Sequence, residues 1–113
     1  MKSSEGSKLL DMLGLARRAG ELIIGQDKIF DALRKGKKLA VFVTNDCSKN
    51  VLRTLETAEG RGGITVLLLK DTDRARLGNS LGLRAAQAAA LPSESGFVRK
   101  SFLLNEDRSD ADE

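Results

Sequence analysis

Apolar side chains recur along this chain in two different periods, and the segments that carry each period predict helices and strands in turn. Residues 7–20 have the three- and four-residue spacing of one helical face, at Leu9, Met12, Leu13 and Ala16. Ser7 is a candidate N-cap for this helix, and Gly20 is its predicted end. Residues 1–6, rich in Ser, Gly and charge, are expected to form a flexible leader.

Continuous apolar runs predict the strands. Residues 21–24 form a short candidate, whereas residues 39–43 are apolar throughout, which is typical of a strand buried on both faces. Residues 64–69 predict the next buried strand. Residues 84–91 are ambiguous because alanine prefers helices, but their position between a glycine and the chain's one proline favours a last strand.

A helix is predicted between the first two strands. It follows Gly25, runs to Lys35 and ends at Gly36. Ile29 and Leu33 are its expected buried side chains.

Three further helical segments follow the second strand. The first has Asp46 or Ser48 as its cap, and its core side carries Val51, Leu52, Leu55 and Ala58. Residues 71–82 predict a short helix, residues 93–104 a closing helix, and residues 106–113 an acidic, disordered tail. Because helices and strands alternate, the fold class is α/β, with helices on both faces of one sheet.

The composition restricts the possible functions more than it restricts the possible folds. The chain has 113 residues, enough for one compact domain, and 31% of them are charged. It has one cysteine and no histidine, so zinc sites with nitrogen or sulfur ligands and histidine-based catalysis are excluded. No apolar run approaches the roughly 20 residues of a membrane span, and no secretory signal is visible, so a cytoplasmic location is expected.

Charge is unevenly distributed along the chain. The formal net charge is +3, but the last eight residues hold five acids and one arginine. Residues 1–105 therefore carry eighteen basic and eleven acidic side chains, which suggests a polyanionic partner. Ordinary solubility is the alternative explanation.

Three stretches, residues 16–48, 61–69 and 76–91, resemble the ribosomal protein L7Ae, L30e, S12e and Gadd superfamily. They carry a glycine before and after the second helix, a buried strand, an Asn- and Asp-rich turn, and an LGxxxG element at Leu77, Gly78 and Gly82. The resemblance implies a three-layer α/β/α sandwich with a central mixed sheet of about four strands, spanning residues 7–105. Residues 93–104 resemble the bacterial single-domain branch, and many members of the superfamily bind kink-turn RNA.

The resemblance also implies an RNA site made of two neighbouring loops, which we call the two-loop edge. Its first part is the start of the second helix, with Gly25, Gln26, Asp27, Lys28 and Asp31, and its second part follows the LGxxxG element, with Leu83, Arg84 and Ala85. Kink-turn binders of the family carry G-x-N-E-x-x-K in the first part.

This chain keeps the glycine of that motif and changes the three polar letters. Asp27 stands in place of Asn, Lys28 in place of Glu, and Asp31 in place of Lys. A carboxylate only accepts hydrogen bonds, so Asp27 loses a donor, whereas Lys28 can donate to a guanine or a phosphate. Lys28 and Asp31 are three residues apart on a helix and are expected to pair with each other.

Other basic residues are candidate phosphate contacts, namely Arg17, Arg18, Lys35, Lys37 and Lys38. The three lysines can equally be a solvated helix end that complements the helix dipole. For Lys28 and Arg84 we favour contacts with RNA, because basic residues in loops often have a functional role.

Two other groups of residues suggest chemistry only weakly. Cys47, without a histidine or second cysteine, is interpreted as a structural thiol. Asp46, Asp71 and Asp73 are better explained as helix caps and turn residues than as a metal site. Residues 60–63 end a helix and are not a phosphate-binding loop.

These observations favour a non-catalytic protein of the ribosome or translation apparatus that binds structured RNA and needs no cofactor. A protein–protein adaptor on the same fold, which has lost standard kink-turn reading, is the alternative. An enzyme is the least favoured class, because catalytic groups are missing.

Overall fold

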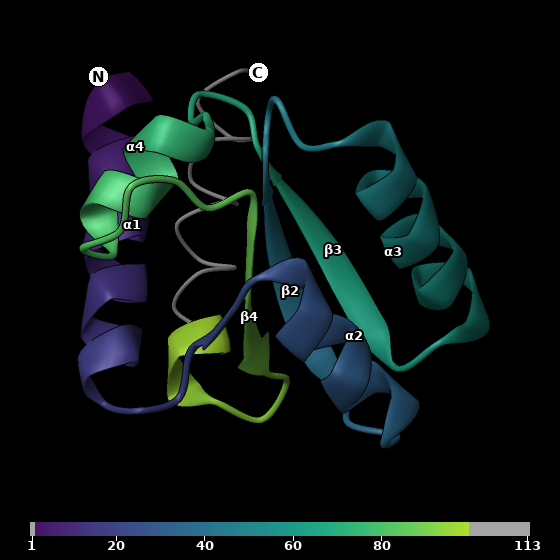
Figure 1. Ribbon diagram of the computed structural model, residues 1–113. Helices are drawn as coiled ribbons and strands as arrows, with labels where there is room; N and C mark the ends of the chain where they lie inside the picture. The colour runs from purple at the N-terminus through teal and green to yellow at the C-terminus, as the bar shows by residue number, and fades with distance from the viewer. Residues whose placement is uncertain (1, 100–113) are drawn as a thin grey trace.

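The computed structural model describes residues 2–99 of the chain, and their side chains from residue 8 onward. One sheet lies between two layers of helices (Figure 1). One face of the sheet carries α1 (Lys2–Arg18) and α4 (Arg74–Ser80), and the other carries α2 (Gln26–Arg34) and α3 (Lys49–Arg61). The predicted α/β/α sandwich is confirmed.

The sheet has four strands in the order β1 (Ile23–Ile24), β4 (Ala88–Pro92), β2 (Leu39–Thr44) and β3 (Ile64–Leu69). β4 pairs antiparallel with both β1 and β2, whereas β2 and β3 are parallel. The parallel pair requires a crossover connection, which α3 supplies. The sheet is therefore mixed, as the family resemblance predicts.

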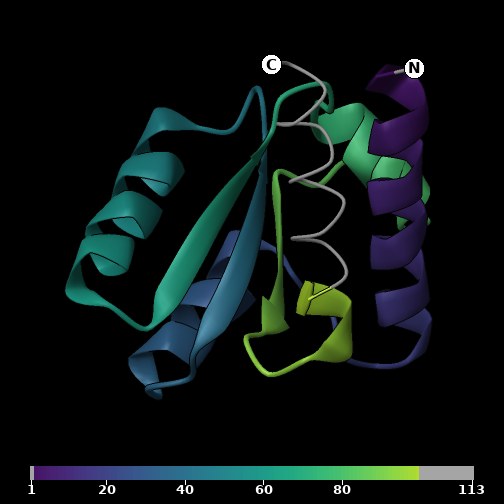
Figure 2. The ribbon, with the colours of Figure 1, turned by 180° about the vertical axis from the view of Figure 1, so that it is seen from behind.

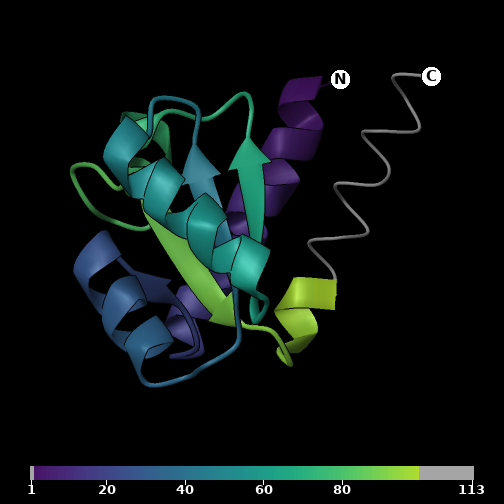
Figure 3. The ribbon, with the colours of Figure 1, turned by 90° about the vertical axis from the view of Figure 1, so that its right-hand side faces the viewer.

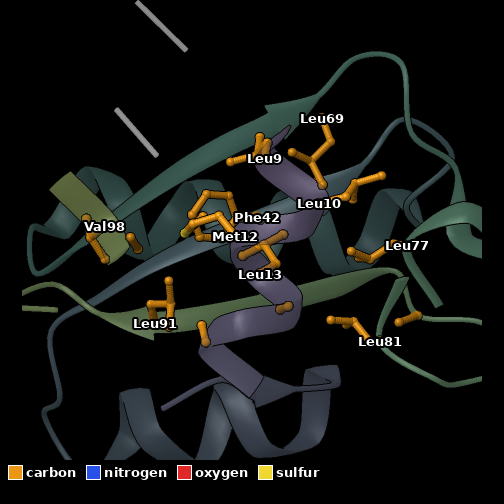
Figure 4. Packing of buried hydrophobic residues seen from close by; sticks show 14 residues of the cluster. Leu9, Leu10, Met12, Leu13, Phe42, Leu69, Leu77, Leu81, Leu91 and Val98 are labelled. Atoms are coloured by element: carbon orange, nitrogen blue, oxygen red, sulfur yellow. The ribbon is translucent and has the colours of Figure 1, made fainter. Parts of the chain in front are cut away.

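Alternate residues of the two central strands enter two separate cores. In β2, Phe42 faces α1, whereas Val41 and Val43 face α2 and α3. Phe42 lies among Met12, Leu13 and other α1 side chains in Figure 4. A strand buried on both faces must be apolar at every position, which explains the continuous run.

β4 is also buried on both faces, and its buried positions carry mainly small side chains. Ala89 belongs to the core beneath α1, and Ala88 and Ala90 belong to the core beneath α2 and α3. All three are completely buried. The segment is a strand although alanine prefers helices, because its central place in the sheet outweighs that preference. The strand begins at Ala88, however, and the residues just before it form a loop.

Several element boundaries differ from the prediction. α1 begins at Lys2, so Ser7 lies inside the helix and is not its N-cap. β3 is an edge strand, and Thr65 and Leu68 are exposed; the prediction of a fully buried strand was wrong, because within residues 2–99 this strand has a neighbouring strand on one side only. The predicted closing helix begins at residue 96 and not at residue 93, and the part of this prediction beyond residue 99, like the predicted acidic tail, lies outside the described residues.

The two helices on the α2–α3 face match their predicted spans closely. Ser48, one of the two predicted caps, accepts a hydrogen bond from the Val51 N–H at 3.4 Å and is the N-cap of α3. In α2 the buried residues are Ile29 and Ala32, and Leu33 is only half-buried. Figure 2, from behind, shows the same layers, with α1 on the face of the sheet opposite to α2 and α3.

Within residues 2–99, no helix has the length and apolarity that crossing a bilayer requires.

Candidate nucleic-acid interface

The two loops predicted to form one edge are in contact. The Gln87 side chain donates from Nε2 to Oε1 of Gln26 at 3.1 Å. The Gly25 N–H donates to the Ala88 carbonyl at 3.2 Å. Both bonds join the start of α2 to Gln87 and Ala88, the segment that leads from the second loop into β4.

Gly25 shapes the first of these loops. Its φ of 96° and ψ of 146° lie in a region that is open almost only to glycine. A Cβ at this position would have no atom within 4 Å, so backbone conformation and not space selects the glycine. The turn allows α2 to start immediately after β1.

Gln87 is a residue that the sequence analysis missed. Its Oε1 accepts from the Ser48 N–H at 2.9 Å, and its backbone carbonyl accepts from the Thr44 N–H at 3.0 Å. One residue, through its side chain and its carbonyl, therefore connects the start of α2, the end of β2 and the cap of α3. The available signal was its place as the lone polar residue in the alanine-rich run of residues 85–90.

The second loop packs tightly against α4 through Gly78. A Cβ on Gly78 would lie 2.5 Å from the Cα of Ala85, so the loop backbone occupies the space of a missing side chain. Hydrogen bonds from Leu83 N–H to the Gly78 carbonyl at 2.8 Å and from Ala86 N–H to the Arg74 carbonyl at 3.0 Å fix the same loop. The LGxxxG element is thus what positions Leu83, Arg84 and Ala85.

Most of the predicted side chains on this edge are accessible. Asp27, Lys28, Arg84 and Ala85 are exposed, while Gly25, Gln26 and Leu83 are half-buried. Asp31 does not pair with Lys28 as predicted. Its carboxylate lies 3.1 Å from Lys35 Nζ and 4.0 Å from an Arg34 nitrogen, because both of those residues follow it along the helix at favourable spacings.

The candidate phosphate contacts fall in different places. Arg17 donates from its guanidinium to the Leu81 carbonyl and so ties α1 to the segment after α4. Arg18 is exposed at the end of α1. Lys35, Lys37 and Lys38 lie at the opposite end of α2 from Gly25, so the structure does not bring them to the two-loop edge.

The cysteine and the acids have structural roles. Burial raises the pKa of the Cys47 thiol, although the positive charge of Arg74 lowers it in part. Asp46 accepts from the Arg74 N–H at 3.0 Å, and Asp73 accepts from the Arg76 N–H at 2.8 Å as the N-cap of α4. Within residues 2–99 no group of three potential ligands could hold a metal ion.

Together these features define a small α/β/α sandwich protein with an open, polar edge built from two glycine-positioned loops. Residues 7–99 match the sequence profile of the ribosomal protein L7Ae/L30e/S12e/Gadd45 family. The chain belongs to this family.

Individual relatives agree with this assignment. The chain is 30% identical over 99 residues to "RNA-binding protein YlxQ" of Bacillus subtilis (strain 168), covering 88% of this chain and 96% of that protein. It is 36% identical over 56 residues to "RNA-binding protein YlxQ" of Enterococcus faecium, covering 50% and 54% of the two chains.

Solved structures show the same fold. A protein of unknown function from Bacillus halodurans superposes with a TM-score of 0.75 at 28% identity, over 86% of this chain and 95% of that one. The Giardia lamblia 15.5kD RNA binding protein superposes with a TM-score of 0.66 at 14% identity, over 89% and 84% of the chains. At that identity the second likeness concerns the fold alone.

Proposed function

We propose that this protein is a non-catalytic RNA-binding protein of the ribosome or translation apparatus, acting in the cytoplasm, and that it recognises structured, kink-turn-like RNA through the two-loop edge. The observation that carries this proposal is the hydrogen bond between Gln26 and Gln87, which joins the start of α2 to the segment that follows the second loop. Family membership and two relatives named as RNA-binding proteins support it.

Charge supports phosphate contacts at this edge. Lys28 and Arg84 are both exposed, one on each loop. Among the ion pairs of the described residues, none includes either of them, so both cationic groups are available to a polyanion. Phosphate contacts of this kind position an RNA and depend steeply on salt.

Base reading is expected to be limited. The Asp27 carboxylate accepts hydrogen bonds and can take those of a guanine Watson–Crick edge. Lys28 donates as a single point charge and therefore discriminates less than a bidentate group. Recognition then rests chiefly on RNA shape and on phosphates, with few base-specific contacts.

The test is filter binding of structured ribosomal RNA at low salt to the full chain. Substituting Lys28→Glu together with Arg84→Glu is expected to weaken binding by at least about tenfold, because two phosphate contacts become repulsive. Lys8→Glu with Arg99→Glu is the matched control, since it changes charge equally at two exposed positions that belong to neither loop. If the unmodified chain binds no more RNA than a neutral control protein, the proposal is wrong.

The alternative is a protein–protein adaptor that uses the same edge. The three changed motif letters, and an Asp31 engaged by its own helix, are the observations that favour it. A pull-down from cells that recovers a stoichiometric protein and no nuclease-sensitive material would support this alternative against RNA binding.

A further inference from the structure

A second concave surface lies between α2 and α3, which we call the α2–α3 groove. It has a volume of about 740 Å³ and is lined by the C-terminal half of α2, the turn that follows it, and one side of α3. Gly62 and Gly63, just after α3, also line it. Figure 3 shows the two helices side by side over this face of the sheet.

The floor of the groove is apolar. Phe30 and Leu33 come from α2, Ala58 from α3, and Ile64 from the first position of β3. The first three are half-buried, so their apolar surface is only partly covered by the protein's own packing. Leu33 was predicted as a core residue of α2, and its partial exposure here is a consequence of facing this groove.

Every charged residue that lines the groove in the described part of the chain is basic. These residues form its rim and are Arg34, Lys37, Lys38, Arg53 and Arg61. All five are exposed, and among residues 2–99 no acidic side chain lines the groove. Of the five, Arg34 alone takes part in an ion pair among the described residues, at 4.0 Å from Asp31. Like charges gathered without counter-charges favour an anionic occupant.

A suitable occupant must be anionic along its length and must also bring flat apolar surface to the floor. Single-stranded RNA has both properties, because its phosphates are continuous and its unpaired bases are free to leave the strand. An RNA duplex keeps its bases stacked inside and would leave the floor uncovered. The volume lies within the usual range of sites that enclose a small ligand, about 300–1,000 Å³.

We propose that the α2–α3 groove binds a single-stranded RNA segment, with phosphates at the basic rim and one or two bases against the floor around Phe30. This is a second site and goes beyond the proposed function, because it requires no structured RNA. The two sites adjoin along α2: the edge uses its first turn and Asp31, whereas the groove begins at Phe30, about 6 Å from Gln26 along the helix axis at a rise of about 1.5 Å per residue. A structured RNA bound at the edge can therefore continue into the groove through a short unpaired extension.

The experiment measures fluorescence anisotropy of a fluorescein-labelled hexa-adenylate RNA with the full chain at low salt. Arg53→Glu with Arg61→Glu is expected to weaken binding by at least about tenfold and to reduce the slope against log salt by about 1.4, the value for two lost single-strand contacts. Both residues are exposed on α3, so the fold should be retained. The neutral pair Arg53→Gln with Arg61→Gln should show the same change in slope without added repulsion.

Two variants locate the binding. Lys8→Glu with Arg99→Glu is expected to leave the affinity within about threefold, because its lost charges act only through long-range attraction. Lys28→Glu with Arg84→Glu should also leave it nearly unchanged while abolishing structured-RNA binding. If hexa-adenylate binding is lost with this edge pair and kept with the groove pair, single strands bind at the edge and the groove proposal is overturned.

Three competitor probes test the chemistry of the occupant. An abasic hexamer of the same charge and a hexaglutamate peptide should each bind at least about tenfold more weakly than hexa-adenylate, because neither stacks a base on the floor. Equal binding of either would show that the groove attracts charge alone, and the proposal would fail. If AMP binds as tightly as the hexamer, the ligand is a free nucleotide and the strand assignment is wrong.

Discussion

The side-chain amide of Gln87 links Gln26 at the start of α2 to Ser48 at the start of α3. It donates to Gln26 Oε1 at 3.1 Å and accepts from the Ser48 N–H at 2.9 Å. Three chain segments that are distant in sequence therefore meet at one amide. This relationship gives the two-loop edge a defined shape, because a hydrogen-bonded amide permits only a narrow range of positions.

Two substitutions of Gln87 distinguish the contributions that its two side-chain hydrogen bonds make to stability. Gln87→Leu removes both and leaves a half-buried Ser48 N–H without its acceptor, so we expect a loss of about 1–3 kcal/mol in the free energy of unfolding. Gln87→Glu keeps the acceptor for Ser48 and loses the donor to Gln26, and should cost less. Urea denaturation compares the two variants, and equal losses would mean that the Ser48 bond contributes nothing.

Gly25→Ala tests the backbone of the first loop. Its φ of 96° should make the substitution cost about 1–3 kcal/mol in the free energy of unfolding, although a Cβ would touch nothing. Gly60→Ala is the matched control, because Gly60 lies inside α3, where a Cβ also meets open space. That variant should gain about 0.4–1 kcal/mol. Similar effects at both glycines would show that conformation at Gly25 is unimportant.

Gly78→Ala tests how α4 positions the second loop. The new methyl group would lie 2.5 Å from the Ala85 Cα, and displacing that backbone should destabilise the protein by about 1–3 kcal/mol. Because Arg84 is next to Ala85, affinity for structured RNA should fall as well. Gly14→Ala in α1, where the Cβ would sit at an ordinary 3.5 Å from Ser80 O, should be neutral or stabilising. Calorimetric melting of both variants distinguishes the effect of the close packing at Gly78 from a general effect of replacing a helical glycine.

Restoring the family's letters is the direct test of the changed motif. Asp27→Asn, Lys28→Glu and Asp31→Lys together should raise affinity for a kink-turn RNA by at least about tenfold, because paired base contacts are typically worth about 1–3 kcal/mol each. The same variant should gain nothing on an RNA duplex without a bulge. The lost Asp31–Lys35 pair should cost only about 0.3–0.5 kcal/mol, since both side chains are more than half exposed. Unchanged kink-turn affinity would favour the adaptor alternative.

The Cys47 thiol should make the free energy of unfolding depend weakly on pH, in a direction set by its raised pKa. Burial raises its pKa above the ordinary value, so between those two pKa values the folded chain keeps a proton that the unfolded chain has released. The free energy of unfolding should therefore decrease as pH rises through this alkaline range, and Cys47→Ser should remove that contribution. Alkylation by iodoacetamide should show a higher midpoint pH in the folded chain than in urea. A midpoint below that of the unfolded chain would indicate a reactive thiol.

Much of the fold was determined by the sequence alone, because burial in a layered α/β protein leaves a local pattern. The apolar run of β2 and the helical spacing of Leu9, Met12 and Leu13 both follow from which faces are covered. Gly25 and the LGxxxG element likewise marked the two loops, since unusual backbone geometry and close approach demand glycine. The family resemblance predicted that these two parts form one edge, and the hydrogen bond from Gln87 to Gln26 joins the start of α2 to the segment that follows the second loop.

Only the tertiary structure decided the partners of the polar groups and the exposure of each strand. Asp31 pairs with Lys35 and not Lys28, β3 is an edge strand, and Gln87 joins three segments. The α2–α3 groove also arises from residues of two helices, the turn after α2 and the glycines that follow α3. None of these leaves a periodic signal, because each depends on side chains brought together from distant positions, and the sequence records spacing along the chain but not distance across it.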